Sequence, residues 1–193
     1  MMRTAIAALL AAAALTGCQQ KTEQKPAETT AQSQAQTDES AIAKRAPRPA
    51  MKQSDARVWI DPVTVAKGKS GAFQIHYYGV EPARAMVLPL SFPVGMRVDS
   101  ISFAGGMLEY LSSRPTRIEN DSHFLLMTAI PMTEPDIPAK EGILARVHFT
   151  LGQDAVSGVI DEVFVPPGNY LTYVDTAGTL IEPVFEPGKL TVQ

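Results

Sequence analysis

The sequence is poor in cysteine, histidine and aromatic residues. Of its 193 residues, one is cysteine, three are histidine and 7% are aromatic. A single cysteine excludes a disulfide within the chain. A zinc-type site needs two histidines close to a carboxylate, and His76, His123 and His148 are scattered along the chain. We therefore predict no metal site and no cofactor.

The short motifs of common enzymes are also missing. The chain has no Gly-x-Ser-x-Gly nucleophile motif and no aspartate-rich calcium loop. Asp161 and Glu162 are adjacent in an expected strand, so they point to opposite faces rather than forming the carboxylate pair of a glycosidase. We predict no catalytic residues. A hydrolase is the least favoured interpretation, because it requires one histidine to meet an acid and a hydroxyl in the fold.

The apolar run near the start is too short to cross a bilayer. It extends from Ala5 to Leu15, eleven residues, where a spanning helix needs about 20. Arg3 precedes it, and it leads into Leu15-Thr16-Gly17-Cys18. This arrangement resembles the lipobox of bacterial lipoproteins, in which small residues mark the cleavage site and the cysteine thiol receives diacylglycerol.

We predict that residues 1–17 are a signal peptide and that lipid on Cys18 anchors the chain in a membrane of the cell envelope. Gln19 follows the cysteine, where an aspartate is typical of retention in the inner membrane. The outer membrane is therefore the expected location, on its periplasmic or surface face.

Residues 18–55 have the composition of a disordered tether. They contain no aromatic residue and one β-branched aliphatic residue, Ile42, among many Gln, Thr, Ala, Glu and Lys residues. Such a segment cannot bury enough apolar surface to offset the entropy lost on ordering. We expect it to hold the rest of the chain clear of the lipid headgroups.

Residues 56–193 have the composition of one folded domain. Val, Ile, Leu, Phe and Tyr become frequent there, and the length suits a single hydrophobic core. The segment carries ten basic and fifteen acidic side chains, a net charge of −5. An acidic domain is a poor match for nucleic acid, so we predict no nucleic-acid partner.

Apolar residues in this domain recur with the period of two that is typical of half-buried strands. The clearest run is Ile143–Leu151, in which every second residue is apolar. Gly and Pro residues interrupt the runs every 10–15 residues, and no window has a helical stripe. The pattern predicts an all-β jelly-roll sandwich of eight or nine strands. Pro89 and Pro183 are expected at sheet edges or bulges, because proline lacks an amide donor.

Several of these segments together resemble the cohesin-like domain, a jelly-roll sandwich related to some carbohydrate-binding modules. The matching segments are Leu88-Pro89-Leu90-Ser91-Phe92 and the strand Gly142–Thr150, which reads GILARVHFT. Pro93 follows Phe92 without the acidic or amide residue that is common at this place in cohesins. The resemblance covers about residues 57–193, and it implies a non-catalytic module that binds a protein through one sheet face.

The binding residues are expected in three segments of unusual composition: 107–120, the Pro-rich loop 132–138, and 165–175. A module for an envelope protein is the leading interpretation. Binding of carbohydrate or peptidoglycan is the alternative, because the chain offers Trp59, Tyr77 and Tyr78 in addition to its loop tyrosines. The candidate binding residues are Tyr110, Arg114, Glu134, Asp136, Tyr170 and Tyr173.

Overall fold

The computed structural model describes residues 51–165 and 168–193. These residues form twelve strands and no helix, so none of them lies in a helix that could cross a membrane. The all-β class is confirmed. The strands are β1 Lys52–Ile60, β2 Val63–Val65, β3 Ser70–Tyr78, β4 Ala83–Ser91, β5 Met96–Ser102, β6 Thr116–Glu119, β7 Phe124–Ala129, β8 Glu141–Leu151, β9 Gly158–Glu162, β10 Thr172–Asp175, β11 Leu180–Glu186 and β12 Gly188–Val192.

The strands are more numerous than the eight or nine expected, partly because two long strands are each broken in two. Pro62 lies between β1 and β2, and Pro187 lies between β11 and β12. Proline has no amide hydrogen for a sheet ladder, so each long strand becomes two shorter ones.

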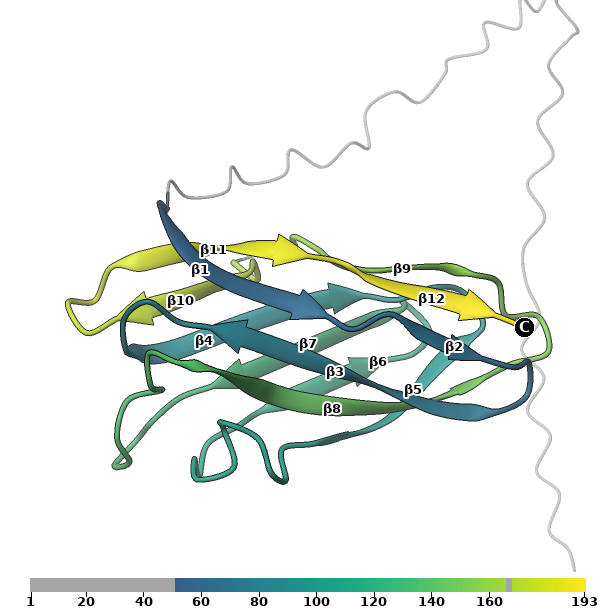
Figure 1. The fold of residues 1–193 in the computed structure, drawn as a ribbon, viewed down its shortest axis with the longest axis horizontal. Coiled ribbons are helices and arrows are strands. Elements are labelled where there is room, and N and C mark those ends of the chain that lie inside the picture. Colours follow the sequence, from purple (N-terminus) through teal and green to yellow (C-terminus); the bar gives the residue numbers. More distant parts are fainter. Residues whose placement is uncertain (1–50, 166–167) are drawn as a thin grey trace, which may run out of the picture. The chain divides into compact units, whose positions relative to one another are not determined.

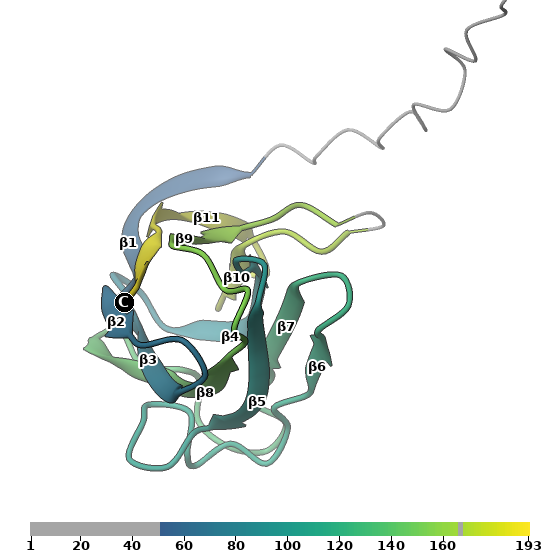
Figure 2. The same cartoon turned by 90° about the vertical axis from the view of Figure 1, so that its right-hand side faces the viewer.

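The strands form one continuous sheet that folds into two layers (Figures 1 and 2). In one layer β11, β1, β3, β8 and β5 follow one another, and in the other β4, β7 and β6 do so. Strands β9 and β10 connect the layers, because both pair with β4 while β9 also pairs with β12 and β10 with β11. The architecture is the expected jelly-roll sandwich.

The first and last strands of the domain run parallel to each other. β1 pairs with β11, from Lys52 opposite Ile181 to Trp59 opposite Glu186, and β2 pairs with β12 in the same sense. β1 starts at Lys52, so the last four residues of the expected tether, 52–55, lie in a strand. Cys18 and most of the tether lie outside the described residues.

The opposite side of the sandwich ends in two strands that each pair on one side, β5 and β6. Asn120, just after β6, links them. Its amide nitrogen donates to the carbonyl of Val98 at 3.1 Å, and its carbonyl oxygen accepts from the amide of Val98 at 2.8 Å. A side chain thus satisfies both backbone groups of an edge residue, and it holds the two layers together at their open side.

The two prolines within strands behave differently from each other. Pro183 lies opposite the bulge of β1 between Gln53 and Arg57, as expected. The expectation for Pro89 is wrong: it lies in β4, an internal strand, and pairs with Leu126 of β7. Proline is tolerated there because of what lies on the side of β4 away from β7. On that side the neighbouring strand changes at Pro89 from β10 to β9.

The core lies between the layers and follows the expected alternation. Phe73, Ile75 and Tyr77 are buried, and so are the alternate residues of β4 from Met86 to Leu90, with Phe92 just after the strand. The expected alternation is interrupted in β8. A bulge lies there, because Ile75 pairs with Ala145 but the next residue, His76, pairs with Ile143. Beyond this bulge the faces exchange: Leu144 is fully buried, and Ile143 turns to the outer face.

Adjacent residues of β8 should differ sharply in their effect on stability. Phe149 is fully buried and His148 is exposed. Truncating a buried phenylalanine costs about 3–5 kcal/mol, whereas an exposed substitution changes stability by about 0.5 kcal/mol or less. We expect Phe149→Ala to lower the free energy of urea-induced unfolding by the larger amount and His148→Ala to leave it almost unchanged. Equal effects would contradict the assignment of the two faces.

Candidate functional site

Four of the expected binding residues meet in one loop cluster. The hydroxyl of Tyr110 donates to the carbonyls of Pro135 and Asp136 at 3.1 and 3.0 Å. The Arg114 guanidinium donates to the carbonyls of Leu108 and Glu109, and it lies over the Phe103 ring at 4.9 Å. The sequence does not show that these two loop segments, separated by strands β6 and β7, are in contact.

Glu134 binds the two loops to each other through its carboxylate. One oxygen accepts from the amide of Ser112 at 2.8 Å, and the other accepts from the amides of Met132 and Thr133 at 2.9 and 3.1 Å. Hydrogen bonds from Ser112, and then from the backbone of the Met132 loop, lower the pKa of Glu134 from its ordinary 4.5 to about 2. The polar groups of this cluster therefore already serve to hold the loops in place.

The two remaining expected residues lie elsewhere. Tyr173 is part of β10 rather than a loop and is fully buried, with its ring edge-on to that of Tyr77 at 6.2 Å. It is a core residue, which removes its ring from the candidate binding surface. Tyr170 is half-buried and stacks on Phe164 at 6.1 Å, in the segment that joins β9 to β10.

The histidines do not meet each other. His76 bonds to Asp61 through Nε2 at 2.8 Å and stacks on Trp59. His148 is exposed on the outer face of β8, and His123 follows the turn after β6 with a φ of 53°. Within the described ranges no group of three His, Cys, Asp or Glu side chains has the geometry of a metal site.

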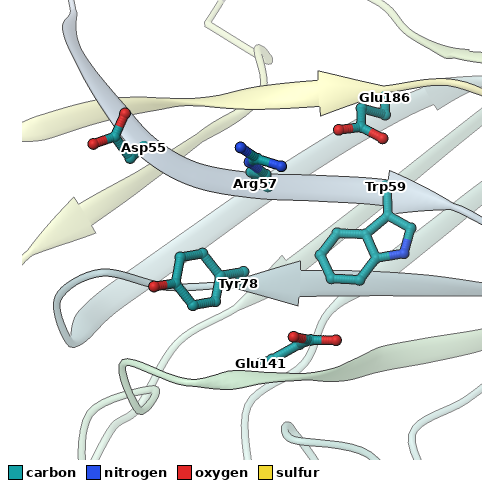
Figure 3. Close-up of a pocket in the computed structure, with 6 residues that line it drawn as sticks. All are labelled: Asp55, Arg57, Trp59, Tyr78, Glu141 and Glu186. Carbon is teal, nitrogen blue, oxygen red and sulfur yellow. The ribbon is translucent and has the colours of Figure 1, made fainter.

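A shallow depression of about 460 Å³ lies on the outer face of the layer that contains β1, β3, β8 and β11 (Figure 3). Two neighbouring rows of the sheet build it. In one row Trp59 lies opposite Glu186, and in the other Arg57 lies opposite Tyr78, which in turn lies opposite Glu141. We call it the Trp59 depression, and its lining residues are Asp55, Arg57, Trp59, Tyr78, Glu141 and Glu186.

Sequence reasoning finds only part of this depression. Trp59 and Tyr78 are among the aromatic candidates, and alternation correctly predicts that Tyr77 and Tyr78 face opposite ways, since Tyr77 is buried and Tyr78 is 41% exposed. Glu141 reaches the outer face because of the bulge at Leu144. Glu186 joins through the parallel pairing of β1 with β11, for which the local sequence carries no signal.

The outer face of the other layer is mainly apolar along β4 and β7. Because the inward residues of β4 and β7 are buried, their alternate residues face outward. Val87 lies opposite Thr128 there, and Pro89 lies opposite Leu126. The amide of Val163 donates to the carbonyl of Pro89 and brings a further apolar side chain alongside. We call this surface the β4–β7 face; these five residues form it, and Pro89 among them is itself buried.

The Glu134 carboxylate should make the stability of the domain depend on pH. Its folded-state pKa is lowered, so its contribution is fully present above its ordinary pKa of 4.5 and is lost as the pH falls towards about 2. We expect Glu134→Gln to lower the urea midpoint at pH 7, and the difference from the original protein to shrink steadily from pH 4.5 to pH 2.5. Asp121→Asn, at an exposed carboxylate, is the control. A difference that does not change with pH would contradict the assignment.

Comparison with known proteins identifies the fold but not a sequence family. No family model and no curated protein sequence matches the chain. Among solved structures, a cohesin of Clostridium thermocellum in a type I cohesin–dockerin complex has a TM-score of 0.61 and 12% identity, covering 72% of this chain and 100% of its own.

Two further cohesins match in the same way. A non-cellulosomal cohesin of the archaeon Archaeoglobus fulgidus has a TM-score of 0.58 and 14% identity, covering 72% of this chain and 92% of its own. A cohesin of Acetivibrio cellulolyticus in complex with a dockerin has a TM-score of 0.59 and 20% identity, covering 71% of this chain and 98% of its own. The domain therefore has the cohesin fold.

Proposed function

We propose that this protein is a non-catalytic binding module that recognises another protein and is held at a membrane by lipid on Cys18. The observation that carries the proposal is the cohesin fold of nearly the whole folded domain. Solved cohesins of this fold include complexes with dockerins from Clostridium thermocellum and Acetivibrio cellulolyticus. The domain is assigned no reaction of its own, and its partner is a folded protein domain of the envelope.

The β4–β7 face is the surface best suited to such a partner. Its outward residues are mainly apolar, and Val87, Leu126 and Val163 are partly exposed. Charged side chains border it, with Arg117 opposite Leu126 and Asp161 opposite Ser91. An apolar centre with a polar border is the usual anatomy of a protein interface. The outer face of the other layer carries charged and aromatic side chains instead.

A charge placed in the middle of the β4–β7 face should abolish partner binding. We expect in-cell crosslinking of the tagged protein to yield one dominant envelope protein, and Leu126→Asp to weaken its binding at least ten-fold, because a desolvated charge opposes apolar contact. The matched control is Gln74→Asp, on the outer face of the other layer.

The thermal unfolding midpoint of each variant separates lost binding from lost folding. A partner that binds the Leu126→Asp variant as well as the original protein would overturn the assignment of the face. Recovery of no specific protein by the well-folded original would overturn the proposed function.

The lipid anchor is a separate part of the proposal. Leu15-Thr16-Gly17-Cys18 supplies the small residues and the thiol that lipidation requires, and several acyl chains give stable anchoring where one gives only marginal binding. Cells fed an alkyne analogue of palmitate should label the original protein. Cys18→Ser should remove the label and shift the protein from the membrane to the soluble fraction.

Density-gradient separation of the membranes tests the proposed outer-membrane location. The original protein should sediment with outer-membrane markers. A Cys18→Ser protein that still carries the label would overturn lipidation at this residue.

A further inference from the structure

We infer that the Trp59 depression is a binding site for an uncharged saccharide. It lies on the outer face of the layer opposite the β4–β7 face, so a saccharide and a protein partner could be bound at the same time. The inference goes beyond the proposed protein-binding function, and neither depends on the other.

The aromatic part of the depression is held in a fixed orientation. The indole ring of Trp59 and the imidazole ring of His76 are stacked, with centroids 5.0 Å apart and planes 8° from parallel. His76 is itself held by its 2.8 Å hydrogen bond to Asp61. Fixing an aromatic ring before the ligand arrives reduces the ordering entropy that binding must overcome.

Tyr78 adds a second ring beside this stack. It lies on β3 opposite Arg57, one row away from Trp59, and it is 41% exposed. Figure 3 shows both rings bordering the same hollow. A pyranose ring has an apolar face of C–H groups that packs on an aromatic ring, while its hydroxyl groups point sideways.

The polar residues around the rings supply partners for such hydroxyls. Arg57 is a donor, and the carboxylates of Asp55, Glu141 and Glu186 are acceptors. Within residues 51–165 and 168–193, these four side chains make no hydrogen bond or ion pair with one another or with other side chains. Asp55 and Glu186 lie on the same side of the rings as Arg57, and Glu141 lies on the other side (Figure 3). A donor flanked by acceptors matches the neighbouring hydroxyl groups of a sugar, each of which both donates and accepts.

The mixture of charges indicates an uncharged ligand. Arg57 lies on β1 beside both rings (Figure 3), where its charge opposes a cation placed over them. The three carboxylates around it oppose an anion. A neutral polyhydroxylated ring meets neither penalty and can use all four groups in charge-assisted hydrogen bonds. The volume of about 460 Å³ falls within the usual size of small-ligand sites, about 300–1,000 Å³.

The site carries its own reporter, because Trp59 is the single tryptophan of the chain. We would titrate the chain from residue 18 onward, with Cys18→Ser, against cellohexaose, mannohexaose and chitohexaose. Tryptophan emission and isothermal calorimetry would be recorded in parallel. At least one of these uncharged hexasaccharides should give a saturable change in both. An oligogalacturonate (anionic) and a chitosan hexamer (cationic) should bind at least ten-fold more weakly.

Variants then test the position of the site. Tyr78→Ala and Glu141→Gln should each weaken the binding measured by calorimetry about ten-fold or more. Gln74→Ala, on the outer face of the same strand as Tyr78, is the matched control and should bind as the original does. Leu126→Asp should also leave saccharide binding unchanged, whereas Tyr78→Ala should leave the protein partner bound.

Three results would each overturn the inference. They are no response to any of the three uncharged hexasaccharides by either method, tighter binding of a charged oligosaccharide, and full binding by a folded Tyr78→Ala variant. Loss of the protein partner with saccharide binding intact would instead overturn only the proposed function.

Discussion

The parallel pairing of the first and last strands is the constraint on which the domain depends. β1 and β2 at the start of the domain lie beside β11 and β12 at its end, so the sandwich closes only when the whole intervening chain has been placed. Such contacts between distant parts of the sequence cost loop entropy before they stabilise the fold. The same two C-terminal strands also connect the layers. β11 pairs with β10 and β12 pairs with β9, and both β10 and β9 pair with β4 of the other layer.

The local pattern of the sequence predicts the strands well and their partners poorly. Alternation identifies the buried faces of β3 and β4, because burial with a period of two depends only on neighbouring residues. It misassigns Ile143, since one extra residue at the Leu144 bulge exchanges the faces of β8. It also places Tyr173 in a binding loop, because a tyrosine near Pro and Gly residues is typical of loops, whereas its ring fills the core beside Tyr77.

The two candidate surfaces differ in how much of them can be foreseen from sequence. The β4–β7 face consists of the outward residues of two adjacent strands, and their apolar character can be read once the inward set is known. The Trp59 depression combines residues from β1, β3, β8 and β11. Its assembly depends on a parallel pair and a bulge, both of which are settled by the tertiary structure.

The position of β1 also determines how the domain meets mechanical load. Force on the chain that precedes Lys52 enters through β1, which is held on one side by β3 and on the other by β11. A pull along the strand direction loads these two rows of hydrogen bonds in shear, so many must break together. A pull across the strands would instead open them one at a time. A domain anchored through this end therefore resists drag along its strands better than drag across them.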